Sequence, residues 1–173
     1  MEPSRVDKAL QNRHKRKYDC CQSVLLAYND LIGVPDRQAY SIAGNYGSAV
    51  GVEGIWDSYE GVILFRYMHV GCGYTFNDIF SNCGALVAAL LVCTIKENPL
   101  IGNVSEKIVE PSELAPIIEE KFAERFGGEK RCGWLSGSRT GGKRIAPCDE
   151  IIRYACKLVE DMVFPGMFEP FEM

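Results

Sequence analysis

The chain has 173 residues, 47% hydrophobic and 24% charged, which is an ordinary composition for a globular protein with a real core. Its net charge of -4 argues against a general nucleic-acid binder. The longest apolar run, about residues 85–95, is too short to span a bilayer, so no membrane association is expected.

The polar start, MEPSR, lacks the apolar stretch of a secretory signal and predicts a cytoplasmic location. Thiols stay reduced there, so the eight cysteines are better explained as ligands, catalytic thiols or core residues than as a disulfide framework.

No internal repeat or linker divides the sequence, so residues 1–173 are expected to form a single domain. Residues 4–17 predict a basic N-terminal helix, and residues 18–163 hold the four-cysteine region described below. The basic side chains indicate either a solvated helix face or a docking patch for an acidic partner. They are Arg5, Lys8, Arg13, Lys15, Arg16 and Lys17.

The next elements are read from capping residues and apolar spacing. Asp19 with Gln22 three positions later predicts a capping box, and the helix that follows should end at Gly33. A short helix over residues 36–42 is expected next. The glycines that follow predict tight turns or close backbone approach: Gly44, Gly47, Gly51 and Gly54. Residues 62–65 fit either a strand or a buried helical turn, and residues 71–73 predict a loop.

Residues 83–97 predict a helix that is apolar on all sides, which is typical of the central element of a bundle. Ser112 should cap a helix that ends at residue 126, and residues 133–146 predict a loop. Pro147 should open a last helix through residue 163, followed by a frayed tail. The fold class expected is mainly α, a compact helical bundle around the buried central helix, with glycine-rich loops.

Three cysteines follow directly after residues that start helices. Cys20 follows Asp19, Cys83 follows Asn82, and Cys148 follows Pro147. The positive end of the helix dipole stabilises anions, so these thiols are expected to have lowered pKa values and to act as nucleophiles or metal ligands. Cys132 lies between two basic residues and a glycine, which again favours a thiolate. The alternative is that all four are ordinary buried cysteines.

The other cysteines and both histidines give weaker signals. Cys93 and Cys156 lie among apolar helical residues and predict core packing, while Cys21 is expected to point away from its neighbour Cys20. Cys72, between two glycines, is a candidate for an additional metal ligand or a resolving thiol. His14 is expected to be solvated, and His69 is expected to be a core or surface residue rather than a ligand.

Several familiar motifs are missing from the sequence. There is no C-x-x-C, so neither a zinc ribbon nor a thioredoxin-type site is indicated, and without C-x-x-C-H no covalent haem is expected. Residues 137–143 match G-x-x-x-x-G-K, but Arg144 stands where a nucleotide-binding loop has Ser or Thr, and no buried strand precedes it. A basic, glycine-rich loop near the cysteine centre is the better interpretation.

The order of these cysteines resembles the C_GCAxxG_C_C family of redox-active proteins. The resemblance covers about residues 15–163. It is carried by YDCCQSV at 18–24, AGNYG at 43–47, CGA at 83–85, Cys132, the Pro147-Cys148 helix start and VE at 159–160. Ala88 stands where the family motif usually has glycine. The gap before Cys83 is longer than usual, so Cys72 competes with Cys83 for the second motif position.

The resemblance extends to the iron–sulfur part of split-Soret cytochrome c. It implies that Cys20, Cys83, Cys132 and Cys148 bind an iron–sulfur cluster, because four thiolates are what a [2Fe–2S] or [4Fe–4S] cluster needs. The spacing does not determine the cluster type. Electron transfer is the function implied, with a redox partner protein that the sequence does not identify, and the family analogy allows a homodimer. The alternatives are a thiol–disulfide redox enzyme or a zinc-stabilised binding module, so enzyme activity stays undetermined.

Overall fold

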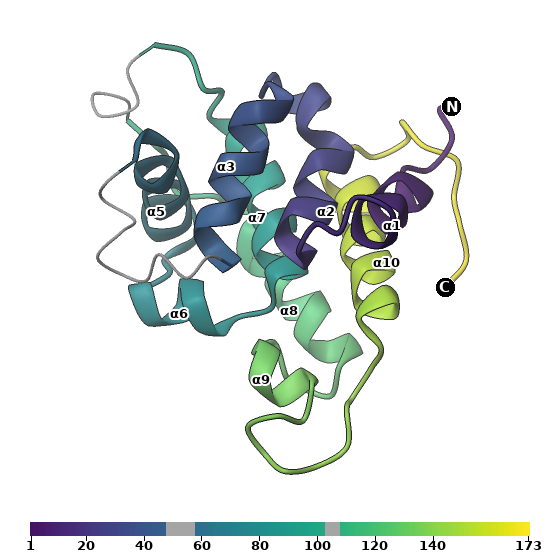
Figure 1. The fold of residues 1–173 in the computed structure, drawn as a ribbon. Helices are drawn as coiled ribbons and strands as arrows, with labels where there is room; N and C mark the ends of the chain where they lie inside the picture. Colours follow the sequence, from purple (N-terminus) through teal and green to yellow (C-terminus); the bar gives the residue numbers. More distant parts are fainter. Residues whose placement is uncertain (48–57, 103–107) are drawn as a thin grey trace.

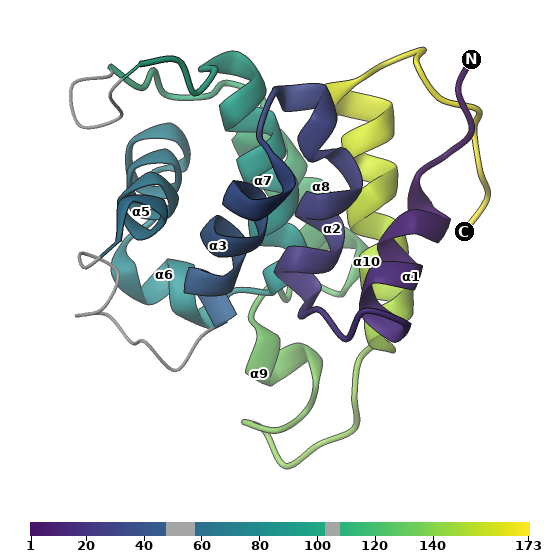
Figure 2. The ribbon, with the colours of Figure 1, turned by 45° about the horizontal axis from the view of Figure 1, so that its top comes forward.

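Helix α7, Gly84–Glu97, runs through the centre of the molecule in the computed structural model, which describes residues 1–47, 58–102 and 108–173. Every residue of α7 from Gly84 to Ile95 is buried. Helix α2, Cys20–Tyr28, packs along α7, and the longer helices α5, α8 and α10 surround it (Figures 1 and 2). The predicted helical bundle around a central apolar helix is confirmed, because a helix that is apolar on all sides needs neighbours on every side.

The remaining elements complete the bundle, and no strand occurs in the ranges that the structure describes. Their bounds are α1 Val6–His14, η1 Asn29–Ile32, α3 Asp36–Gly47, α5 Tyr59–Cys72, α6 Phe76–Ser81, α8 Ala115–Arg125, α9 Cys132–Leu135, α10 Cys148–Leu158 and η3 Val159–Val163.

The start of α2 forms the predicted capping box. The Asp19 carboxylate accepts the backbone N–H of Gln22 at 2.7 Å, and the Gln22 side chain accepts the backbone N–H of Asp19 at 3.1 Å. The helix continues as the 3-10 turn η1 and ends at Gly33, whose φ of 69° suits glycine. Both ends of this helix are therefore determined by local sequence.

Two predictions in the middle of the chain are wrong in detail, and a third, which left a strand or a buried helical turn open for residues 62–65, is resolved as helix. Gly44 and Gly47 belong to helix α3 rather than to turns, while Gly51 and Gly54 lie outside the described residues. Residues 62–65 lie in helix α5, where they pack against α3 and α7. Gly71 and Cys72 end that helix, and only Gly73, with a φ of 72°, leaves it. The common reason is that packing against neighbouring helices, mainly α2 and α5 in the case of α3 and mainly α3 and α7 in the case of α5, favours helix where single-residue signals are weak.

The last two long helices begin close to the predicted residues. The Ser112 hydroxyl accepts the backbone N–H of Ala115 at 3.0 Å, so it caps α8 although the regular helix starts three residues later. Pro147 is the N-cap residue of α10, which continues as the π-helix η3. Residues 133–146 are largely a loop, as predicted, apart from the single turn α9.

The buried carboxylate of Glu160 joins both ends of the chain to the bundle. It accepts hydrogen bonds from the Tyr28 hydroxyl at 2.7 Å, the Arg5 backbone N–H at 2.7 Å and the Ser4 hydroxyl at 3.1 Å. The predicted fraying of the C-terminal tail is wrong, because the backbone of Glu2 pairs with residues 167 and 169. The N- and C-terminal segments accordingly run along the same side of the molecule, beside α1 and α10 (Figure 1).

Helices α2 and α7 approach each other most closely at Gly84. A Cβ atom there would lie 2.9 Å from the Tyr46 ring, 3.1 Å from the Cys21 backbone nitrogen and 3.4 Å from the Cys21 Cβ. Any side chain would push the two helix starts apart. The absence of a Cβ at Gly84 therefore lets Cys20 and Cys83 lie next to each other.

No helix in the described ranges is both long enough and apolar enough to cross a membrane.

Gly84→Ala should lower the free energy of unfolding by about 1–3 kcal/mol, the usual cost of overpacking a filled core site. Alanine has a higher helix propensity than glycine, so a loss of stability in this variant would come from the steric conflict and not from helix propensity. Chemical denaturation of the reduced protein measures the change.

The matched control is Gly44→Ala, also in a helix. Its added Cβ would meet only the end of the flexible Gln22 side chain, at 3.2 Å. This variant should be neutral or slightly stabilising. Equal changes in stability for Gly84→Ala and Gly44→Ala would show that the α2–α7 contact does not depend on the absence of a Cβ at Gly84.

Candidate functional site

Four cysteines from four separate helix starts line one cavity of about 220 Å³. Cys20, Cys132 and Cys148 are the first residues of α2, α9 and α10. Cys83 is itself the N-cap residue of α7, whereas the sequence predicted Asn82 for that role. Asn82 instead ends α6, and its backbone pairs with that of Arg131. The structure thus brings together all four cysteines singled out from the sequence.

The other polar residues that line this cavity are Asp19, Tyr46, Ser136 and Arg144. The Tyr46 hydroxyl donates a hydrogen bond to the backbone carbonyl of Asn82, just before Cys83. The Arg144 guanidinium donates a hydrogen bond to the Cys148 sulfur at 3.3 Å. The basic loop therefore lies near the cysteine centre, as expected, and one of its cations, Arg144, contacts the Cys148 sulfur.

The four thiols oppose one another's ionisation. Burial raises the pKa of Cys20 to about 12, with further contributions from Cys83, Cys148 and Cys132. Burial also raises the pKa of Cys83 to about 12, although the N–H groups of Leu86 and Ala85 bond to its sulfur and act in the other direction. The pKa of Cys132 is raised by burial and by Cys148, and Arg144 partly offsets this.

The predicted lowering of these pKa values is therefore wrong for Cys20, Cys83 and Cys132. Helix N-termini do favour thiolates, as the two backbone contacts of Cys83 illustrate. However, desolvation and the repulsion between neighbouring thiolates outweigh this effect. The cavity needs added positive charge before several of its sulfurs can ionise together.

Within the described residues, no three His, Cys, Asp or Glu side chains are grouped closely enough to hold a metal ion as they stand. The four sulfurs therefore border the cavity without forming a ready set of ligands. A water molecule occupies about 30 Å³ in the liquid, so the cavity has room for a group of several heavy atoms.

Cys72 lies away from these four residues. It ends α5 and borders a separate cavity next to Glu119 and Lys130. Burial raises its pKa, and the nearest ionisable groups that contribute are Cys93, Glu119 and Glu97. The structure thus places Cys83, and not Cys72, beside the other candidate cysteines.

The remaining cysteines are buried in the core, as their apolar neighbours predicted. Cys93 and Cys156 are fully buried, and the Cys93 sulfur lies 3.4 Å from a Glu97 carboxylate oxygen. Cys21 is fully buried against α7 and forms no disulfide with Cys20.

Neither histidine lines the cysteine cavity. His69 is exposed, stacks on Phe65 and lies 2.7 Å from the Tyr74 carbonyl through Nδ1. His14 is also exposed, and its Nε2 lies 2.8 Å from the Asp149 carboxylate.

Sequence reasoning did not single out Tyr46 as a residue of the site. The signal available was its position in the AGNYG segment, which the family resemblance had already marked. Burial raises the pKa of Tyr46, with added contributions from Cys83, Cys21, Cys132 and Cys20. Its phenol therefore stays protonated and able to donate.

Comparisons with protein-family models, with curated proteins and with solved structures found no match for this chain.

The raised pKa of Cys83 predicts a loss of stability at high pH in protein freed of metal. The folded-state pKa, about 12, lies above the ordinary value of 9.0, so the unfolded chain loses its proton first as the pH rises. The contribution of the Cys83 thiol to the free energy of unfolding is fully present below pH 9 and declines as the pH rises toward 12. At pH 10 the titration of this one thiol should lower stability by roughly 1 kcal/mol relative to pH 7.

Urea unfolding of the chelator-treated, reduced protein at both pH values measures this loss. Cys83→Ala should lose roughly 1 kcal/mol less than the unmodified protein over the same interval, because the titrating thiol is absent. Equal losses in both proteins would show that the Cys83 thiol is not held neutral by its surroundings.

Arg144→Gln should slow the alkylation of Cys132 at pH 8. Arg144 lowers the pKa of that thiol, so its removal raises the pKa and leaves less of the reactive thiolate. Iodoacetamide labelling followed by mass spectrometry measures the rate at Cys132. Lys143→Gln, which removes a neighbouring exposed cation, is the control and should leave the rate unchanged. An unchanged rate in Arg144→Gln would contradict the role given to this arginine.

Proposed function

We propose that this protein binds an iron–sulfur cluster through Cys20, Cys83, Cys132 and Cys148 and transfers electrons. The observation that carries the proposal is that these cysteines, from four separate elements, line one cavity. Four cysteine sulfurs are the ligand set of both common cluster types. The resemblance to the C_GCAxxG_C_C family supports the same four residues. In a reducing cytoplasm these thiols would stay available as ligands.

The electrostatics of the cavity give a physical reason for metal binding. Cys20 and Cys83 resist ionisation because they are buried and because the neighbouring thiolates repel each other. Iron ions would remove both obstacles, since a coordinated thiol is deprotonated outright. The cluster, when bound, would supply one-electron redox chemistry.

The protein's own residues would orient and tune such a cluster. Hydrogen bonds to cluster sulfurs raise or lower the reduction potential, and Arg144 already donates one to Cys148. The Gly84 contact holds Cys20 and Cys83 at one wall of the cavity.

A bound cluster would require the sulfurs to lie closer together than they do in the structure. The short helix α9 and the segment after it project from the end of the bundle in Figures 1 and 2. Cys132 is the exposed cysteine of the four. Because it stands on this projecting segment, Cys132 is the ligand we expect to move inward on binding.

The site bears differently on the two alternatives. A thiol–disulfide enzyme, in which Cys20 or Cys148 would attack, needs a thiolate near neutral pH, whereas burial raises the pKa of Cys20 to about 12. A zinc-stabilised module uses the same four sulfurs but predicts tightly held zinc and no redox activity.

The proposal is tested by anaerobic purification and reconstitution with iron and sulfide. We expect brown protein with visible charge-transfer absorption and stoichiometric iron and sulfide. Serine at any of the four positions, Cys20, Cys83, Cys132 or Cys148, should abolish or severely weaken that absorption, because oxygen poorly replaces a soft thiolate.

Two cysteines outside the cavity provide matched controls. Cys72→Ser should leave iron content and absorption unchanged, because Cys72 borders a different cavity. Cys93→Ala should also keep the cluster while lowering stability by roughly one to a few kcal/mol, as for other buried sites. Colourless protein without iron after reconstitution, or loss of the cluster in Cys72→Ser, would overturn the proposal.

A further inference from the structure

A second cavity, of about 480 Å³, lies directly outside the cysteine centre. It lies between α6 and the segment around α9, and Cys132 lines both cavities. The other side chains around it are of two kinds, aromatic and polar or cationic: Phe80 and Trp134, then Asn77, Ser81, Arg131 and Arg139. No acidic residue is among its described lining residues.

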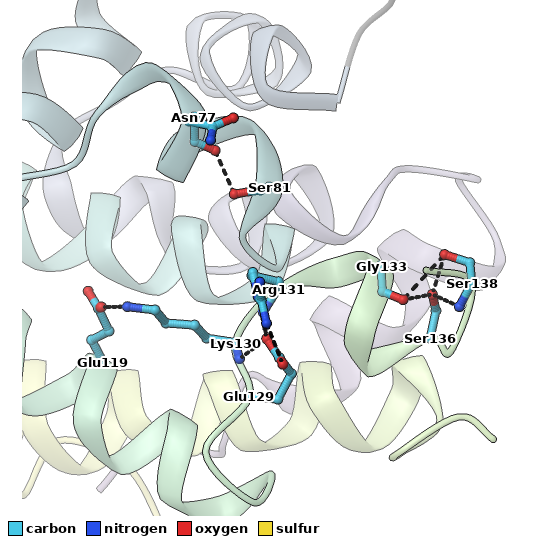
Figure 3. Close-up of polar contacts among 9 residues, drawn as sticks. All are labelled: Asn77, Ser81, Glu119, Glu129, Lys130, Arg131, Gly133, Ser136 and Ser138. Carbon is cyan, nitrogen blue, oxygen red and sulfur yellow. Dashed lines mark hydrogen bonds and ion pairs between the residues drawn. The ribbon is translucent and has the colours of Figure 1, made fainter. Parts of the chain in front are cut away.

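Most cations near this cavity are already neutralised. Figure 3 shows Lys130 directed at Glu119 and Arg131 directed at Glu129. Arg131 reaches both carboxylate oxygens of Glu129, at 2.9 and 3.1 Å. The charges of these two pairs therefore largely cancel.

Arg139 is the exception. In the part of the chain that the structure describes, no acidic group forms an ion pair with its guanidinium. Its backbone N–H donates to the Gly133 carbonyl at 3.0 Å. A Cβ at Gly133 would lie only 2.3 Å from the Arg139 Cγ, so this glycine lets the arginine side chain lie across α9. Among the described residues, the guanidinium of Arg139 is therefore a cation of this cavity that lacks an acidic partner.

The aromatic wall of the cavity is held in place. The Arg131 guanidinium lies 3.8 Å from the centre of the Trp134 ring, and Glu129 in turn fixes that guanidinium. A ring stacked in this way keeps its orientation, which suits it to contact a second planar group. Phe80 adds further apolar surface to the same cavity.

We propose that this outer cavity binds a small anion with a planar aromatic ring. The anionic group, a phosphate or carboxylate, pairs with Arg139, and the ring packs against Trp134 and Phe80. Such a ligand lies against Cys132 at the mouth of the cysteine centre. The inference concerns binding alone and stands whether or not the inner cavity takes up a cluster.

Flavin mononucleotide is the first probe, and riboflavin, which has the same ring without the phosphate, is its comparison. Calorimetry on the full-length, reduced protein should show flavin mononucleotide binding at least tenfold more tightly than riboflavin. 2-Naphthoate, a smaller aromatic carboxylate, serves as a second probe in case the flavin ring is too large.

Arg139→Gln should weaken binding of the anionic probe about tenfold or more and leave riboflavin binding unchanged, and Arg139→Lys should restore part of the loss. Trp134→Leu should weaken binding of both flavins. Arg37→Gln, an exposed arginine on α3, is the control and should bind like the unmodified protein. Circular dichroism verifies that each variant is folded.

Protection of Cys132 from iodoacetamide locates the ligand. The bound anion should slow alkylation of Cys132, and Arg139→Gln should abolish that protection. The proposal fails if neither flavin mononucleotide nor 2-naphthoate binds at millimolar concentration. It also fails if binding is the same in Arg139→Gln, or if Cys132 is alkylated equally fast with the ligand present.

Discussion

The close packing of α2 against α7 at Gly84 is the contact on which the site depends. Both helices begin at this contact: α2 begins with Cys20, and Cys83 is the N-cap residue of α7. With the backbone of Cys21 only 3.1 Å from the position of a Cβ on Gly84, the starts of the two helices cannot separate or slide without losing core contacts. Two of the four candidate ligands are thus fixed by the densest part of the core, whereas Cys132 lies on a short peripheral helix.

Burial and mutual repulsion of the thiols follow from the same arrangement. Four helix starts that converge would normally favour negative charge, yet the sulfurs of Cys20 and Cys83 are too desolvated and too close to other thiols to ionise near neutral pH. Arg144 supplies a single cation at the edge of the group. In such a cavity neither Cys20 nor Cys83 is a free nucleophile near neutral pH.

The exposed side of the centre differs in character from its buried side. Cys132 borders both cavities, and the outer one combines two aromatic rings with an arginine that has no acidic partner among the described residues. Glu129 holds the Arg131 guanidinium along this wall (Figure 3), and that guanidinium in turn lies over the Trp134 ring. The chain therefore places the most accessible of its four candidate cysteines at a surface with the features of a binding site.

The sequence by itself determined the starts of α2 and α10 and the existence of the central helix. Asp19 with Gln22, and Pro147 before Cys148, act through contacts within a few residues, and an apolar face all around residues 84–95 can only be buried. Tertiary structure alone decided which cysteines meet. Cys72 is as conspicuous in the sequence as Cys83, but α5 carries it to the side of Glu119. Tertiary structure also reversed the predicted direction of the thiol pKa values, because desolvation and repulsion between thiols depend on neighbours that are distant in the sequence.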